Sequence, residues 1–161
     1  MLSVPFEKLH PKAVVPKRKS AGASGYDLCC IHAEVFNGLQ TQKIKTGLSL
    51  SIPQGFEGQI RLRSSVAARG YLIPNAPGTI DSDYRGEIII LLARFSYPDT
   101  DSWTDSFKAG EAIAQLVITT TFEVLFVENK NLPSTIRGNG GFGSTNDLHS
   151  IGYYTSRSDV Y

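Results

Sequence analysis

The sequence has 161 residues and a formal net charge of +1, with 41% hydrophobic and 19% charged residues. This length suits one domain, and the charge balance argues against both a general nucleic-acid-binding face and an acidic disordered chain. Residues 1–20 lack the apolar core of a secretory signal, and no stretch approaches the roughly 18 apolar residues of a membrane-spanning helix. We therefore expect a cytoplasmic protein whose residues 1–20 form a lead-in outside the core, with no nucleic-acid or membrane partner.

The first candidate strand follows the segment Ser24-Gly25-Tyr26-Asp27-Leu28. Asp27 stands at a glycine-led strand start, where a carboxylate either holds a hydrated metal ion or caps a turn. Cys29 and Cys30 come next, and adjacent strand residues point to opposite faces, so a disulfide between them would be strained. We expect reduced structural cysteines, which favours the cytoplasm.

The rest of the pattern predicts β-structure almost throughout. Alternation over 48–52 predicts a half-buried strand, and the continuous apolar run over 87–95 predicts one buried on both faces. Further predicted strands cover 56–62, 112–118 and 121–127, separated by Gly- and Pro-containing turns. The fold class expected is therefore all-β, a jelly-roll-like barrel or sandwich with a β core over 24–136.

One short helix is predicted over 64–70, with serines capping its start and Gly70 ending it. Ser64 and Ser65 would present hydroxyl and backbone N–H groups, and Arg63 beside them is a bidentate phosphate donor. This segment is thus either an anion site or simply a capped helix with a surface arginine.

The segment 77–87, PGTIDSDYRGE, is rich in turn residues. It is either a plain hairpin turn or a site in which Asp81 acts as a general base and Tyr84 forms a flat wall against a sugar or base. Gln115 interrupts the apolar strand over 112–118, so its amide needs polar partners, either in a buried network or at a site.

The segment 137–146, RGNGGFGSTN, cannot bury enough apolar surface to fold alone. Glycine-rich backbones form anion-binding nests, Arg137 is a phosphate donor, and Phe142 offers a ring on which a nucleobase can stack. We interpret residues 137–145 as a lid that orders over a phosphorylated nucleotide, the alternative being a flexible linker; no role is assigned to the tail over 146–161.

Taken in order, these segments resemble the five motifs of the trimeric deoxyuridine triphosphatases, or dUTPases. The motifs are SGYDL (24–28), PQGFEGQIRLRSS (53–65), NAPGTIDSDYRGE (75–87), AGEAIAQL (109–116) and RGNGGFGST (137–145). The sequence departs from the family pattern at Ser65, where glycine is usual, at Asn146, and in a segment between Val66 and Pro74 that is one residue short.

The resemblance implies a homotrimer whose active sites are shared between chains, with the lid closing from another subunit. It implies Mg²⁺-dependent hydrolysis of dUTP to dUMP and pyrophosphate, which lowers dUTP and supplies dUMP for thymidylate synthesis. Asp81 matches the general base, and Asp27 matches a metal anchor that acts through water. The phosphate-binding positions implied are Arg63, Ser64, Ser65, Gln115, Arg137, Gly143, Ser144 and Thr145.

The resemblance also implies how the nucleoside is selected. Tyr84 would pack where a 2′-hydroxyl would sit, and Phe142 would stack on the base. Groups that face the uracil edge or line its pocket would come from Asn75, Gly78, Thr79, Ile80 and Ile89. Because cytosine reverses the donor and acceptor pattern of uracil, it would leave buried polar groups unpaired.

Two alternatives stay open at this point. A dCTP deaminase, including a bifunctional form, shares the fold, but its proton-shuttling glutamate would stand where this sequence has Leu91. A non-catalytic nucleotide-binding regulatory module is the other, and the presence of Asp81, Tyr84 and Arg137 argues against it.

Overall fold

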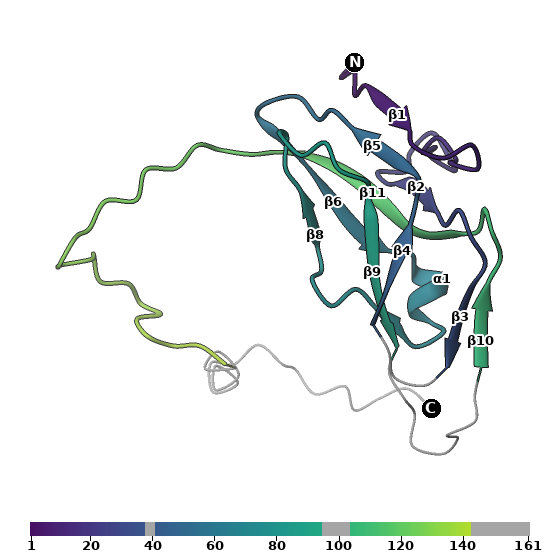
Figure 1. The fold of residues 1–161 in the computed structure, drawn as a ribbon. Coiled ribbons are helices and arrows are strands. Elements are labelled where there is room, and N and C mark those ends of the chain that lie inside the picture. Colours follow the sequence, from purple (N-terminus) through teal and green to yellow (C-terminus); the bar gives the residue numbers. More distant parts are fainter. Residues whose placement is uncertain (38–40, 95–103, 143–161) are drawn as a thin grey trace, which may run out of the picture. The chain divides into compact units, whose positions relative to one another are not determined.

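The computed structural model of the chain describes residues 1–37, 41–94 and 104–142. The chain divides into two units, Met1–Glu123 and Val124–Tyr161. All the strands and the helix belong to the first unit (Figure 1). They are β1 (Phe6–Lys8), β2 (Tyr26–Cys29), β3 (Glu34–Asn37), β4 (Thr41–Lys45), β5 (Leu48–Leu50), β6 (Phe56–Leu62), α1 (Ser64–Ala67), β7 (Tyr71–Leu72), β8 (Gly78–Ile80), β9 (Ile89–Arg94), β10 (Thr104–Phe107) and β11 (Ala112–Thr120).

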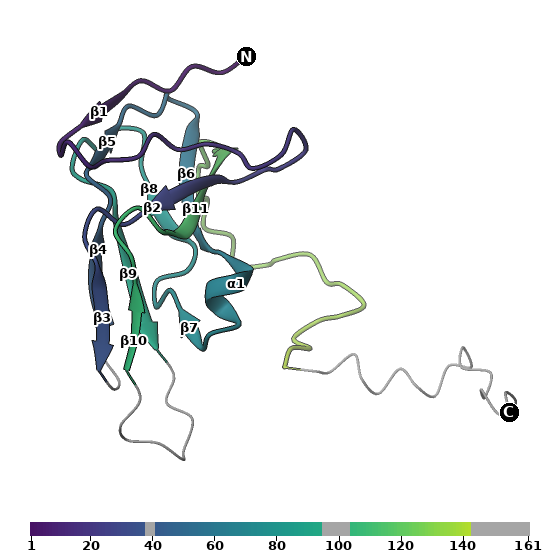
Figure 2. The same cartoon turned by 90° about the vertical axis from the view of Figure 1, so that its right-hand side faces the viewer.

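Two larger sheets carry the fold, and their strand orders are β2-β11-β6-β8 and β4-β9-β7. Two strand pairs, β1-β5 and β3-β10, complete the unit, and every pairing is antiparallel. Figure 2 shows β4 beside β9 and β3 beside β10. The predicted all-β, jelly-roll-like class with one short helix is confirmed.

The apolar core draws on both larger sheets. Leu28 and Leu116 of the first sheet belong to the same buried cluster as Ile44, Ile90 and Leu92 of the second. Cys29 and Cys30 are buried free thiols, and burial raises the pKa of both, which agrees with the expected structural role. Among the described residues, no helix is long and apolar enough to cross a membrane.

Several local predictions need correction. The run over 87–95 becomes β9, in which Ile90 and Leu92 are buried while Ile89 and Leu91 on the other face are half-buried, so only one face enters the core. In β5 all residues are buried, because the Ser49 hydroxyl is satisfied by the Arg85 carbonyl. The 121–127 segment forms no strand among the described residues, since nothing there pairs with it.

The turn around Asp81 is not a hairpin, because β8 pairs with β6 and not with β9. The residues expected to form a lead-in contribute β1, which pairs with β5, and Ala13, which is buried in the core. Lys17 also lies along β2, where its carbonyl accepts a hydrogen bond from Asp27 N–H at 3.0 Å.

Candidate active site

A pocket with a volume of about 390 Å³ opens beside β8 and β9, and we call it the β8–β9 pocket. It contains the residues that the sequence assigned to the nucleoside and to the general base. The predicted residues that line it are Asn75, Gly78, Thr79, Ile80, Asp81, Tyr84 and Ile89. The structure therefore brings this half of the predicted site together.

Asp81 lies at the end of β8, where the chain turns outward. Its carbonyl accepts a hydrogen bond from Tyr84 N–H at 3.1 Å, which brings the tyrosine back over the pocket. The Asp81 side chain is exposed, and it also borders a larger hollow of about 830 Å³ that Asp83 and Arg85 help to line. A carboxylate at this rim can receive a proton from a water molecule that also contacts a ligand in the pocket.

The β8–β9 pocket has further lining residues beyond those predicted to bind dUTP. Lys43 of β4 and Leu91 of β9 stand directly opposite each other in the β4–β9 ladder, and both line the pocket. Ile60 and Glu87 also line it, and the Glu87 carboxylate accepts a hydrogen bond from Gly47 N–H at 2.9 Å. Only the strand pairing brings Lys43 here, so no local sequence pattern could have found it.

A second group of predicted residues lies on β2, β11 and the end of β6. Asp27 is 8% exposed, and its Oδ2 lies 3.5 Å from Arg63 Nη1. Gln115 stands opposite Asp27 in the β2–β11 ladder. Its side chain packs against Gly25, where an added methyl group would lie only 2.7 Å from Gln115 Cδ. We call Asp27, Arg63 and Gln115 the Asp27–Arg63 cluster. A lysine that the sequence placed in the lead-in also reaches it, because Lys19 Nζ is 3.5 Å from Asp27 Oδ2.

The short helix beside this cluster differs from the prediction. α1 has a single turn, and the residue at its N-cap is Arg63, without a side-chain capping bond, so the serines do not cap it. Ser64 and Ser65 are exposed instead. Gly70 ends this region with a φ of 84°, as expected for a glycine stop. What α1 contributes is therefore two exposed hydroxyl groups next to the Arg63 guanidinium.

The two groups of predicted residues do not share one hollow in the part of the chain that is described. The lining of the β8–β9 pocket includes none of Asp27, Arg63, Ser64, Ser65 and Gln115. The strands β2, β11, β6 and β8 of one sheet contribute to both groups. In β6, Arg61 stands opposite Gln115, while the adjacent Ile60 lines the pocket. The described part of a single chain thus offers the β8–β9 pocket and the Asp27–Arg63 cluster separately.

The second unit carries the start of the lid segment. Arg137 Nε donates a hydrogen bond to the Gly140 carbonyl at 3.0 Å, and Gly138 has a φ of 50°. Phe142 is exposed. Gly143, Ser144 and Thr145 lie outside the described residues.

Comparison with known proteins bears directly on these motifs. Residues 11–146 match the dUTPase family. The chain belongs to the dUTPase family. A deoxyuridine 5′-triphosphate nucleotidohydrolase of Wolinella succinogenes is 45% identical over 139 residues, which is 86% of this chain and 90% of the relative.

Two further dUTPases extend the comparison. A deoxyuridine 5′-triphosphate nucleotidohydrolase of Helicobacter pylori strain Shi470 is 39% identical over 145 residues, or 89% of this chain and 97% of the relative. The structure of Staphylococcus bacteriophage 80alpha dUTPase with dUPNHPP is 26% identical, with a TM-score of 0.80 over 89% of this chain and 98% of that one. The fold and most of the sequence are therefore those of a dUTPase.

The dUTPase family implies Mg²⁺, and Asp27 fits an indirect role toward it. No group of three His, Cys, Asp or Glu side chains close enough to share a metal ion occurs among the described residues. Asp27 Oδ2 is buried, and within the same residues it accepts no hydrogen bond. Since Mg²⁺ in phosphate-binding sites usually keeps several waters, this carboxylate suits a metal-bound water better than direct coordination.

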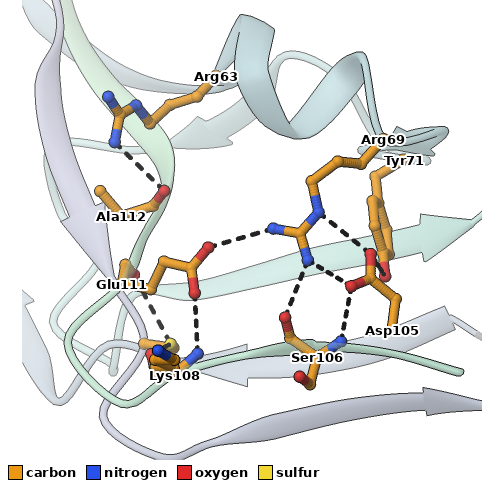
Figure 3. A network of polar contacts seen from close by, with 9 residues as sticks. Arg63, Arg69, Tyr71, Asp105, Ser106, Lys108, Glu111 and Ala112 are labelled. Atoms are coloured by element: carbon orange, nitrogen blue, oxygen red, sulfur yellow. Dashed lines mark hydrogen bonds and ion pairs between the residues drawn. The ribbon is translucent and has the colours of Figure 1, made fainter.

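A network around Arg69 braces the region between α1 and β11 (Figure 3). The Arg69 guanidinium follows α1, donates to Asp105 Oδ1 at 2.7 Å and Oδ2 at 3.1 Å, and donates to Glu111 Oε1 at 3.1 Å. Its Cζ lies 4.1 Å from the centroid of the Phe107 ring. The network joins the segment after α1 to β10 and to the turn before β11, whose first residue, Ala112, accepts a hydrogen bond from Arg63 Nη1 at 3.4 Å.

The network perturbs two titratable groups. Burial alone would raise the pKa of Asp105, but hydrogen bonds from Arg69, Ser106 N–H and Tyr71 outweigh it, so the pKa is lowered. Burial, with the hydrogen bond from its hydroxyl to Asp105, raises the pKa of Tyr71 to about 12. Because the folded pKa of Asp105 is lowered, its stabilising contribution is complete above the ordinary pKa and is lost as the pH falls through the folded value.

Replacing Arg69 by methionine is expected to lower the free energy of unfolding at pH 7 by about 1–3 kcal/mol, because the Asp105 carboxylate loses its charged partner. Urea unfolding measures this change. As the pH falls below about 4, the ordinary pKa of an aspartate, the difference between variant and wild type should begin to shrink, and it should vanish only when the pH has passed the lowered pKa of Asp105 in the folded wild type. Arg61→Met removes an exposed arginine bonded to Gln59 and should change stability by about 0.5 kcal/mol or less. Equal losses in the two variants would contradict the bracing role.

Proposed function

We propose that this chain hydrolyses dUTP to dUMP and pyrophosphate. The observation that carries the proposal is the β8–β9 pocket, in which a dUTPase-family chain gathers Asp81, Tyr84 and the 75–80 segment around one cavity. Leu91 lines this pocket, where a deaminase would need a carboxylate to move protons at a cytosine ring. Hydrolysis is therefore favoured over deamination.

Asp81 is the general base in this proposal. Its carboxylate takes a proton from a water molecule, and the water oxygen forms a new bond to the α-phosphorus in line with the leaving group. The bond between the α-phosphorus and the bridging oxygen breaks, and pyrophosphate departs with that electron pair. An exposed carboxylate at the rim of a nucleoside pocket is suited to this step.

The Asp27–Arg63 cluster, with Ser64 and Ser65, would bind the phosphates. Arg63 and the serine hydroxyls donate hydrogen bonds to oxygens that gain charge as pyrophosphate leaves, and Gln115 adds an amide. Mg²⁺, when bound with the triphosphate, neutralises charge, and Asp27 would hold it through a metal-bound water. Asp27 Oδ2 supports this assignment, because it is buried, accepts no hydrogen bond among the described residues and lies 3.5 Å from the charged groups of Lys19 and Arg63.

Specificity would come from the β8–β9 pocket. Asn75 and the backbone of Gly78–Ile80 would meet the uracil edge, while Ile89 lines the cavity. A cytosine in the same place would leave polar groups unpaired. The Tyr84 ring would occupy the space that a 2′-hydroxyl needs.

A homotrimer with shared sites accounts for two features of the single chain. The nucleoside pocket and the phosphate-binding cluster do not share a hollow in the described residues, as expected if a neighbouring chain completes each site. The 122–127 segment also exposes apolar side chains, which association would cover. These side chains are Phe122, Val124, Leu125, Phe126 and Val127.

The lid would close over this shared site. Arg137, Gly143, Ser144 and Thr145 from another chain would hold the γ-phosphate, and Phe142 would stack on the base. The exposure of Phe142 in the described lid segment supports a contact made only when nucleotide is present. A cytoplasmic location accords with the two free thiols.

Pyrophosphate release from dUTP, dCTP, dTTP and UTP, each with and without Mg²⁺, tests the function. We expect turnover of dUTP with Mg²⁺ and little turnover of the other nucleotides. Ammonia release from dCTP would support deamination, and binding of dUTP without pyrophosphate release would support the regulatory module. Either result would overturn the proposal.

A further inference from the structure

Gly86 lies directly against the ring of Tyr84. A methyl group built on Gly86 would overlap the Tyr84 hydroxyl, and it would lie 2.5 Å from Cζ and 2.9 Å from Cε2. Carbon atoms that are not bonded to each other pack at roughly 3.5–4.0 Å. The ring can therefore occupy its present place only because residue 86 has no side chain.

Hydrogen bonds hold the backbone on both sides of Gly86, at Arg85 and at Ile88, and so resist its movement away from an added methyl group. Four hydrogen bonds tie the flanking residues to β5 and to the turn before it. They run from Ser49 Oγ to Arg85 O (2.7 Å), from Gly47 N to Glu87 Oε1 (2.9 Å), from Ile88 N to Leu48 O (2.7 Å) and from Thr46 Oγ1 to Ile88 O (2.6 Å). Thr46 and Ile88 are fully buried, which makes the two bonds that Ile88 forms costly to break.

The Tyr84 ring has more freedom than this backbone. Its hydroxyl donates to the Glu87 carbonyl at 3.1 Å, but the side chain is 43% exposed, so its outer face is not packed. Breaking this one exposed hydrogen bond costs less than disrupting the buried bonds that hold the backbone at Ile88. Rotation of the Tyr84 ring would thus relieve the steric clash with a methyl group at residue 86.

We propose that Gly86 sets the position of the Tyr84 ring and so determines how strictly the site rejects a ribonucleotide. The inference rests on the proposed dUTP hydrolysis and adds a positioning residue to it. Glycine at 86 lets the ring lie across the pocket wall, where it occupies the space of a 2′-hydroxyl. Moving the ring outward frees that space and leaves Asp81 and the phosphate-binding groups in place.

Gly86→Ala tests this inference through substrate preference. We expect the ratio of kcat/KM for dUTP to that for UTP to fall by about tenfold or more, the scale on which steric pockets discriminate small groups. The kcat for dUTP should change much less, because the general base is not moved. An unchanged ratio would overturn the inference, whereas no pyrophosphate release from dUTP by the wild type would refute the proposed function instead.

Two further variants separate ring displacement from a general effect of mutation. Gly22→Ala, at a glycine with open space around it, should leave the ratio unchanged. In a Tyr84→Ala background, Gly86→Ala should cause no further loss of discrimination, because no ring remains to be displaced. An equal further loss in that background would overturn the inference.

The ring position also has a readout that needs no substrate. In protein labelled with ¹³C in its tyrosine rings, Gly86→Ala should shift the Tyr84 resonance, which Tyr84→Phe identifies, and Gly22→Ala should not. An unmoved resonance would overturn the inference whatever the enzyme's activity. If Gly86→Ala fails to fold, the Tyr84→Ala/Gly86→Ala double variant should still fold, because it has no ring to clash with. If the double variant also failed to fold, the clash would lie in the backbone, which would contradict the proposal.

Discussion

Replacing Asp81 by asparagine is expected to slow pyrophosphate release from dUTP by about 10²–10⁴-fold while nucleotide binding is retained. Asparagine has nearly the same shape as aspartate, but its amide cannot take a proton from water. Asp81 is exposed at the end of β8, so the substitution disturbs no buried contact of the core. Single-turnover kinetics would measure the chemical step, and calorimetry with a non-hydrolysable dUTP analogue would measure affinity.

A neighbouring carboxylate provides the control for Asp81. Glu57 borders the larger hollow beside Asp81 but not the β8–β9 pocket. It accepts a hydrogen bond from Gln59 Nε2 at 2.7 Å, and glutamine can keep that bond. Glu57→Gln should therefore hydrolyse dUTP at close to the wild-type rate. Wild-type turnover by Asp81→Asn would remove the residue from the role of base.

The grouping of residues around the β8–β9 pocket could be predicted from the sequence because these residues are close together in the chain. Asn75, Gly78, Ile80, Asp81 and Tyr84 lie within one segment, and a strand followed by a tight turn can only present them together. A short sequence motif predicts a site well when the residues of that site are neighbours along the chain. The same logic explains why the predicted helix over 64–70 overlaps α1, which ends at Ala67, three residues before the positive-φ Gly70.

Residues brought in by strand pairing could not be predicted in this way. Lys43 reaches the β8–β9 pocket only because β4 pairs with β9, and Lys19 reaches Asp27 only because the N-terminal segment runs along β2. Both contacts depend on long-range register, which leaves no periodic signal in either segment.

The misassigned strands have a related cause. A continuous apolar run such as 87–95 does not say whether its second face meets core or cavity, and in β9 Ile89 and Leu91 meet the pocket. The apolar residues over 121–127 identify a segment suited to a strand but not the chain that would pair with it. If the chain assembles with shared sites, as proposed, part of the information in its sequence concerns its neighbours.

Truncating the chain after Pro133 is expected to lower dUTP hydrolysis by about 10³–10⁵-fold, the scale of an arginine clamp on a transferred phosphate. The truncation removes Arg137, Phe142 and residues 143–145. No described residue of the unit Val124–Tyr161 belongs to the buried core, so the thermal midpoint should stay close to that of the full chain. Arg137→Lys keeps the charge but loses the bidentate fork, and it should show an intermediate rate. Full activity in the truncated protein would mean that the lid is dispensable.

Complementation would show whether the lid and the general base of one site come from different chains. The truncated chain keeps Asp81 but lacks the lid, and the full-length Asp81→Asn chain keeps the lid but lacks the base. If sites are shared, a coexpressed mixture contains some sites with both parts. Its activity should then be far greater than the sum of the activities of the two variants. If each chain builds its own site, every site in the mixture lacks one part, and activity should stay at the sum of the two variants. Comparison with the same variants purified separately and combined only in the assay distinguishes subunit mixing from simple addition of the two proteins.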